Sequence, residues 1–121
     1  MERWADAEQS FRKAVAIQAP LVNQFPEAPY YGLWMATFRI ALADVLIRRN
    51  QPGEGRTELE GTISALVRQL EQRPEINSLH DLLALGYSKL EIALREAGEN
   101  GLAAEAARKA AQERNSVRRS P

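Results

Sequence analysis

The chain has 121 residues, in which 16 basic side chains balance 16 acidic ones, and it contains no cysteine. The missing cysteine excludes disulfide bonds, thiolate catalysis and cysteine-ligated zinc, and the balanced charge offers no global field for nucleic acid or an anionic membrane. No apolar run approaches the length of a membrane span, and the first residues lack the apolar core of a signal peptide. We therefore expect one cytoplasmic domain with no nucleic-acid and no membrane partner.

The composition and the turn residues predict an all-α fold. Alanine and leucine, which favour helices, are much more frequent than the β-branched residues that favour strands. Proline lacks the amide hydrogen that a helix needs and glycine adopts the left-handed conformation that ends one, so these residues divide the chain into about five helices. We expect a single domain over residues 1–115 and a flexible tail over residues 116–121. The helices are predicted near residues 2–25, 30–49, 53–72, 77–97 and 101–115.

The apolar pattern differs from helix to helix. The second predicted helix is apolar on nearly every side, which is typical of a helix packed between others, whereas the fifth carries mainly alanine and should be the least buried. Pro20 lies inside the first helix, removes the hydrogen bond to Ala16 and predicts either a kink or two short helices. Six aromatic residues around the first turn are predicted to be core, with an exposed aromatic groove for a peptide as the alternative: Trp4, Phe11, Tyr30, Tyr31, Trp34 and Phe38.

Several sequence features recur at one constant spacing, which is roughly 48 residues and marks an internal repeat. The turn at residues 50–53 recurs at residues 98–101, and Phe25-Pro26 falls on Arg73-Pro74. The repeating unit is therefore two antiparallel helices with two turns, and such units bury their apolar faces by stacking on one another. The first predicted helix has no partner within its own unit. Either the chain is cut from a longer array, or another molecule covers that face.

The residues of the first helix resemble a known family. The spacing of Ala7, Phe11 and Ala14 ahead of Pro26 looks like the second helix of a tetratricopeptide repeat. Residues 7–18, followed by residues 24–31, are similar to the long tetratricopeptide-like repeats that follow bacterial serine/threonine protein kinase domains. The resemblance implies a right-handed superhelical stack of antiparallel helix pairs in a larger bacterial protein linked to a kinase. The repeat period of this chain is longer than the usual 34 of the family, and the chain itself has no kinase motif.

No constellation of residues indicates catalysis or metal binding. His80 is the only histidine, and its neighbour Asp81 points about 100° away from it on a helix. The acidic residues are spread along the chain and form no ligand set with a histidine. We therefore expect no enzyme, no cofactor and no bound metal, and we interpret His80 as structural or solvent-facing.

The expected function is a non-catalytic scaffold for protein–protein interaction. In the geometry that the resemblance implies, the second and fourth helices line a concave face that binds a protein or peptide partner. The alternative is self-association into a homodimer, in which the first helix docks on its copy through Trp4, Phe11, Val15 and Val22. The residues expected on the concave face are Thr37, Ile40, Asp44, Ile47 and Arg48 on the second helix, and Leu85, Ser88, Lys89, Ile92 and Arg95 on the fourth.

Overall fold

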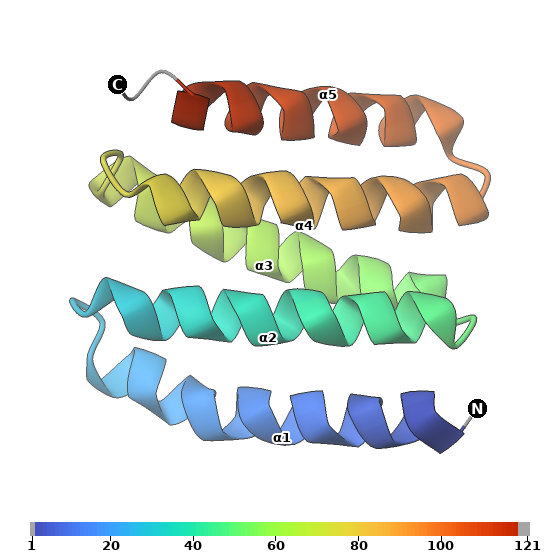
Figure 1. The fold of residues 1–121 in the computed structure, drawn as a ribbon, viewed down its shortest axis with the longest axis horizontal. Coiled ribbons are helices and arrows are strands. Elements are labelled where there is room, and N and C mark those ends of the chain that lie inside the picture. The colour runs from blue at the N-terminus through green and yellow to red at the C-terminus, as the bar shows by residue number, and fades with distance from the viewer. Residues whose placement is uncertain (1, 119–121) are drawn as a thin grey trace.

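The computed structural model describes residues 2–118, which form five helices and no strand (Figure 1). The all-α prediction is therefore confirmed, and every predicted helix exists. The helices are α1 (Glu2–Gln24), α2 (Pro29–Arg48), α3 (Pro52–Gln72), α4 (Asn77–Glu96) and α5 (Asn100–Arg118).

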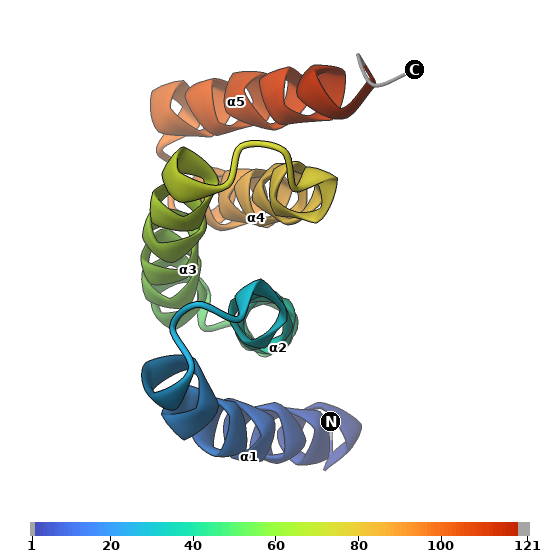
Figure 2. The same cartoon turned by 90° about the vertical axis from the view of Figure 1, so that its left-hand side faces the viewer.

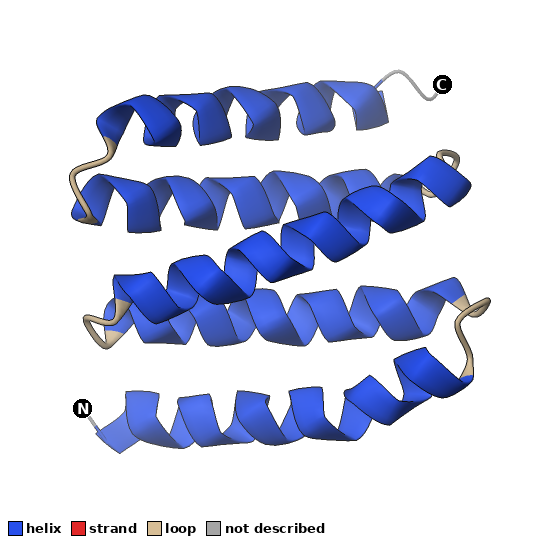
Figure 3. Cartoon of the chain, turned by 180° about the vertical axis from the view of Figure 1, so that it is seen from behind, coloured by secondary structure: helices blue, strands red, loops and turns tan. Residues whose placement is uncertain are grey.

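Consecutive helices run antiparallel, so α2 and α4 are parallel and lie side by side (Figure 1). The helix α3 crosses both of them on one side, which is clearest from behind (Figure 3). Figure 2 shows α3 in one layer, α2 and α4 in the other, and α1 and α5 at the two ends. Among the described residues, the backbone of α1 packs against α2 alone and the backbone of α5 packs against α4 alone.

The core lies around α2, as the apolar pattern of this helix predicts. Ile40, Ala43 and Ile47 of α2 form a buried cluster with Leu59 of α3 and Ala93 of α4. A second cluster joins the same three helices nearer the start of α4. By length and composition α2 could also cross a membrane, but the same apolar composition suits its place among α1, α3 and α4.

The turns of the backbone follow the repeat of the sequence. Asn50 lies just after the end of α2 and has a φ of 65°. Gly98 lies at the equivalent position after the end of α4 and has a φ of 78°. In both turns a residue in the left-handed conformation allows the amide that follows to bond a carbonyl of the last helical turn, because this conformation reverses the chain direction. These bonds run from Gln51 N to Leu46 O (2.8 Å) and from Glu99 N to Leu94 O (2.9 Å).

The connection from α1 to α2 also has its counterpart between α3 and α4. The amide of Ala28 bonds the carbonyl of Phe25 at 3.1 Å, and the amide of Ile76 bonds the carbonyl of Arg73 at 3.3 Å. The turns at equivalent positions of the repeat therefore contain the same backbone hydrogen bonds. The two antiparallel units predicted from the sequence are thus present in the backbone.

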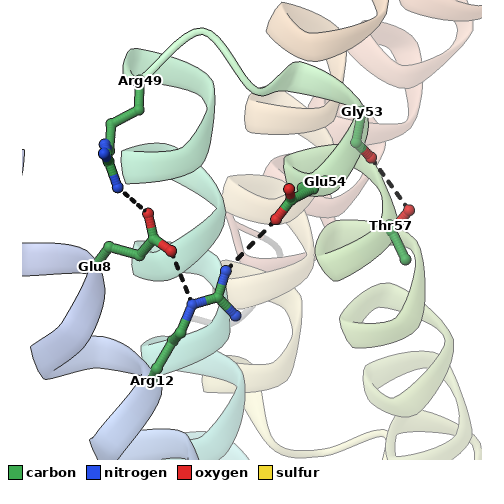
Figure 4. Close-up of polar contacts among 6 residues, drawn as sticks. All are labelled: Glu8, Arg12, Arg49, Gly53, Glu54 and Thr57. Atoms are coloured by element: carbon green, nitrogen blue, oxygen red, sulfur yellow. Dashed lines mark hydrogen bonds and ion pairs between the residues drawn. The ribbon is translucent and has the colours of Figure 1, made fainter. Parts of the chain in front are cut away.

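Ionic contacts join α1 to the turn after α2 (Figure 4). Glu8 of α1 accepts hydrogen bonds from Arg12 Nε at 2.9 Å and from Arg49 Nη1 at 2.5 Å. Arg12 in turn lies 3.5 Å from Glu54, at the start of α3. The hydrogen bond from Arg12, opposed by partial burial and reinforced by Arg49, holds the pKa of the Glu8 carboxyl below its usual value.

Two predictions about the ends of the chain need correction. The helix α1 continues through Pro20 as one helix, so the alternative of two short helices is wrong; its last turns bend toward α2 in Figure 1. The helix α5 extends to Arg118, because no proline or glycine lies between Gly101 and that residue, and the rest of the predicted tail lies outside the described residues. A larger share of the described side chains is exposed in α5 than in α1, although α5 buries three alanines against α4.

Candidate functional site: a groove between α2 and α4

A hollow with a volume of about 650 Å³ lies between the C-terminal halves of α2 and α4. These halves lie next to each other because the two helices are parallel and begin at equivalent positions of the repeat. Both apolar and charged side chains reach the groove. Its lining consists of Asp44, Ile47, Arg48, Asn50, Lys89, Ile92 and Glu96.

The carboxylate of Asp44 bridges the two helices that form the groove. Its Oδ1 lies 3.1 Å from Lys89 Nζ of α4, and its Oδ2 accepts a hydrogen bond of 3.0 Å from Arg48 Nε of its own helix. The Arg48 guanidinium also lies 5.2 Å from the ring centroid of Trp4, a cation–π distance. One carboxylate thus faces two cations, and a second anionic group can replace it at either of them.

The apolar part of the groove combines a buried and an exposed isoleucine. Ile47 belongs to the core cluster, whereas Ile92 remains 43% exposed. A partner side chain that covers Ile92 would gain free energy, because burial of apolar surface is favourable.

Half of the ten residues predicted for the concave face meet in this groove. They are Asp44, Ile47, Arg48, Lys89 and Ile92. The geometry implied by the family resemblance placed them on one face of each helix, and the parallel packing of α2 and α4 brings these five residues together.

Ile40 does not belong to this surface. It is 2% exposed and packs in the core between α3 and α4, so its prediction as a partner-binding residue is wrong. Ile47 is likewise a core residue, and only the edge of its side chain reaches the groove. The cause is the neighbouring α4, which covers this side of α2 and which no helical period can reveal.

The other predicted residues lie outside the groove. Thr37 lines a separate hollow beside Trp34 and Phe38. Ser88 accepts a hydrogen bond of 3.4 Å from Arg114 of α5. Arg95 pairs with Glu91 one turn earlier on its own helix, and Leu85 is exposed nearer the start of α4.

Asn50 also lines the groove, although the sequence predicted it only as a turn residue. Its positive φ turns the chain at the end of α2 and places it beside the groove. Its equivalence to Gly98, which has no side chain, is the signal that could have drawn attention to this asparagine.

The residues predicted for self-association lie on the side of α1 that faces α2. Trp4 lies under Arg48 of α2, and Val22 lines a small hollow with Gly32 of α2. Gln18, between Val15 and Val22 on this side, donates a hydrogen bond to the carbonyl of Tyr31. The other two predicted residues, Phe11 and Val15, are also partly buried. The expectation that these four residues form an open face is therefore wrong.

His80 has a partner that is distant in the sequence. Its Nδ1 lies 2.7 Å from Glu113 Oε1 of α5, and it donates the hydrogen bond because a carboxylate only accepts. Tyr87 is near the same carboxylate, and burial, with a smaller contribution from Glu113, raises the pKa of its phenol. This pair joins α4 to α5, in line with the structural interpretation of His80.

The aromatic residues of the first turn divide between core and surface. Tyr31 is partly buried and stacks on Phe25, with ring centroids 5.5 Å apart. Trp34 and Tyr30, in contrast, are more than half exposed. The prediction of an aromatic core is thus wrong for these two residues, because no helix of the described chain covers that side of α2.

Residues 2–118 contain no cluster of three histidine or acidic side chains that could hold a metal ion. No family model matches the chain, and neither does any curated protein or solved structure. The groove between α2 and α4, with its apolar floor and its paired charges, is therefore the best-formed candidate site.

Proposed function

We propose that the protein is a non-catalytic interaction scaffold whose α2–α4 groove binds a segment of a partner protein. The observation that carries the proposal is the exposed Ile92 beside the Asp44–Lys89 contact. An apolar side chain of the partner covers Ile92, and an acidic group next to it competes with Asp44 for Lys89 or Arg48.

The resemblance to tetratricopeptide-like repeats supports the same proposal. Parallel first helices line the binding face in that family, and the resemblance assigns this role to α2 and α4. We propose accordingly that the chain is a region of a larger, cytoplasmic bacterial protein linked to a kinase.

Peptide selection tests the proposed groove. A phage-displayed library of random peptides is selected on the wild-type chain, and the peptides obtained are measured by calorimetry against Ile92→Asp, Lys89→Ala and a matched control. The control is Leu102→Asp, which changes a similarly exposed apolar residue on α5. A buried carboxylate without a partner is costly, so we expect Ile92→Asp to weaken binding about tenfold or more.

Two results would contradict the proposed function. One is a set of peptides that binds the Ile92→Asp and Leu102→Asp variants equally well. The other is a library that yields no peptide above background on a chain whose circular dichroism shows it to be folded.

A further inference from the structure

A second apolar surface lies at the α1 end of the stack. Ile17 of α1 is 69% exposed and Trp34 of α2 is 59% exposed. Beside Trp34, a hollow of about 350 Å³ opens along Thr37 and Phe38. We call this surface the end face. It consists of Ala14, Ile17 and Leu21 of α1 and of Trp34 and Phe38 of α2.

The repeat shows what covers the equivalent surface of α4. Trp34 and Phe38 of the first unit correspond to Leu82 and Gly86 of the second. Leu82 packs against the cluster that contains Ile40 of α2, and a Cβ on Gly86 would lie 3.8 Å from Ile40 Cδ1. The side of α4 that corresponds to Trp34 and Phe38 is therefore covered by α2.

The same equivalence holds for α1 and α3. Ala14, Ile17 and Leu21 correspond to Thr62, Ala65 and Gln69, which line a small hollow with residues of α2. The side-chain amide of Gln69 lies so close to α2 that a Cβ on Gly32 would collide with it. The groove between α3 and α4 thus holds one helix, α2, whereas nothing within the described chain fills the equivalent groove between α1 and α2.

Only part of this groove is open. Val45, the equivalent of Ala93, is buried, and Trp4 lies nearby against Arg48. The N-terminal end of α1 therefore packs against the C-terminal half of α2. The open part comprises the C-terminal half of α1 and the N-terminal half of α2, where Ile17 and Trp34 are exposed.

The opposite end of the stack is polar. The buried Ile40, Ala43 and Leu66 of the first unit become Ser88, Glu91 and Arg114 in the second. Charged side chains here would lose their hydration under another helix. Copies of the chain therefore cannot stack head to tail, with the polar end of one on the end face of the next.

We propose that the end face binds an amphipathic α-helix of a partner protein, at the place that α2 occupies against α3 and α4. The bound helix lies parallel to α2 and antiparallel to α1. Its buried stripe carries apolar residues at the spacing of Leu33, Ala36 and Ile40, because these residues fill the equivalent part of the groove between α3 and α4.

The charges near the end face specify the partner further. In the filled groove, Arg39 of α2 pairs with Glu58 at 3.1 Å and lies over Gly61. The residues equivalent to Glu58 and Gly61 on α1 are Ser10 and Lys13, both exposed. A partner helix with an acidic residue at the place of Arg39 therefore complements Lys13, whereas a basic residue is repelled.

Titration with a helix derived from α2 tests this proposal. The probe is a peptide with the sequence of residues 29–40, the part of α2 that fills the corresponding half of the groove. In this peptide Arg39→Glu is introduced, and the residues that face neither α3 nor α4 are replaced by Glu and Lys. The chain is labelled with ¹⁵N at tryptophan, which gives one indole signal each for Trp4 and Trp34. We expect a saturable shift of the Trp34 signal, and we expect Ile17→Asp to weaken binding about tenfold or more.

Matched variants separate the possible results. Leu102→Asp and Ile92→Asp should leave the Trp34 shift unchanged, so a failure of the α2–α4 groove is distinguishable from a failure of the end face. The proposal is overturned if the Trp34 signal stays fixed at millimolar peptide, or if Ile17→Asp binds as the wild type does. It is also overturned if the chain alone sediments as a dimer that Ile17→Asp dissociates, because a second copy then covers this face.

Discussion

Glu8 of α1 and Arg56 of α3 hold equivalent positions of the repeat and make similar contacts with opposite charge. Each bridges the residue four positions further along its own helix and a residue in the turn that follows the next helix. Glu8 contacts Arg12 at 2.9 Å and Arg49 at 2.5 Å, whereas Arg56 contacts Glu60 at 3.0 Å and Glu99 at 2.6 Å. Because the charges are inverted, α1 is electrostatically complementary to the turn after α2, and α3 is complementary to the turn after α4.

This inversion predicts that charge reversal in one unit can be compensated within that unit. Glu8→Arg places a cation beside Arg12 and Arg49 and should lower the free energy of unfolding by about 1–2 kcal/mol, since each exposed pair contributes up to about 1 kcal/mol. The triple variant Glu8→Arg, Arg12→Glu, Arg49→Glu restores both ion pairs of residue 8 but places a carboxylate near Glu54, so it should regain part of the loss. Urea denaturation measures both variants, and a triple variant less stable than Glu8→Arg would contradict the prediction.

The lowered pKa of Glu8 predicts a pH-dependent contribution to stability. A carboxyl whose pKa is lower in the folded than in the unfolded chain stabilises fully above its ordinary pKa, here 4.5, and this stabilisation is lost as the pH falls through the folded value. Carboxyl groups become protonated as the pH falls below about 5. Over this range, the free energy of unfolding should therefore decrease less for the Glu8→Gln variant than for the wild type. Thermal denaturation across this range tests it, with Glu75→Gln, an exposed carboxylate, as the control.

Two glycines near the start of α3 should respond oppositely to the same substitution. A Cβ on Gly55 would lie 2.9 Å from Ile47 Cγ1 and 3.1 Å from the Ala43 carbonyl oxygen, whereas a Cβ on Gly53 meets nothing within 4 Å. We expect Gly55→Ala to destabilise the fold by about 1–3 kcal/mol, because the core must move apart. We expect Gly53→Ala to stabilise it by about 0.5–1 kcal/mol through helix propensity. Chemical denaturation that gives both changes the same sign would refute this packing of α2 on α3.

Pro20 should limit the stability of α1. It is exposed and lies inside a continuous helix, so it removes one backbone hydrogen bond without contributing to the core. Pro20→Ala should therefore raise the free energy of unfolding by about 1–3 kcal/mol. Pro52→Ala is the matched control, since Pro52 begins α3, where its missing amide hydrogen costs little. An equal effect of the two substitutions would argue against a helix that runs through Pro20.

The local structure of this protein could be predicted from its sequence. Proline and glycine stop a helix by their own covalent geometry, so residues 50–53 and 98–101 mark the turns without knowledge of the fold. The spacing of these turns also revealed the repeat that the backbone hydrogen bonds now display. The geometry implied by the family resemblance assigned Asp44 and Lys89 to one face, and in the structure Asp44 Oδ1 lies 3.1 Å from Lys89 Nζ.

Burial, in contrast, was decided by the tertiary structure. Ile40 and Ile92 are similar residues on the same side of parallel helices, yet Ile40 is buried and Ile92 is exposed. The reason is the number of neighbours, because α2 has α4 beside it whereas α4 has no parallel helix beyond it among the described residues. The exposure of Trp34 has the same cause at the other end of the stack. A helical period identifies which residues share a face, but only the packing of whole helices determines whether water or another helix covers that face.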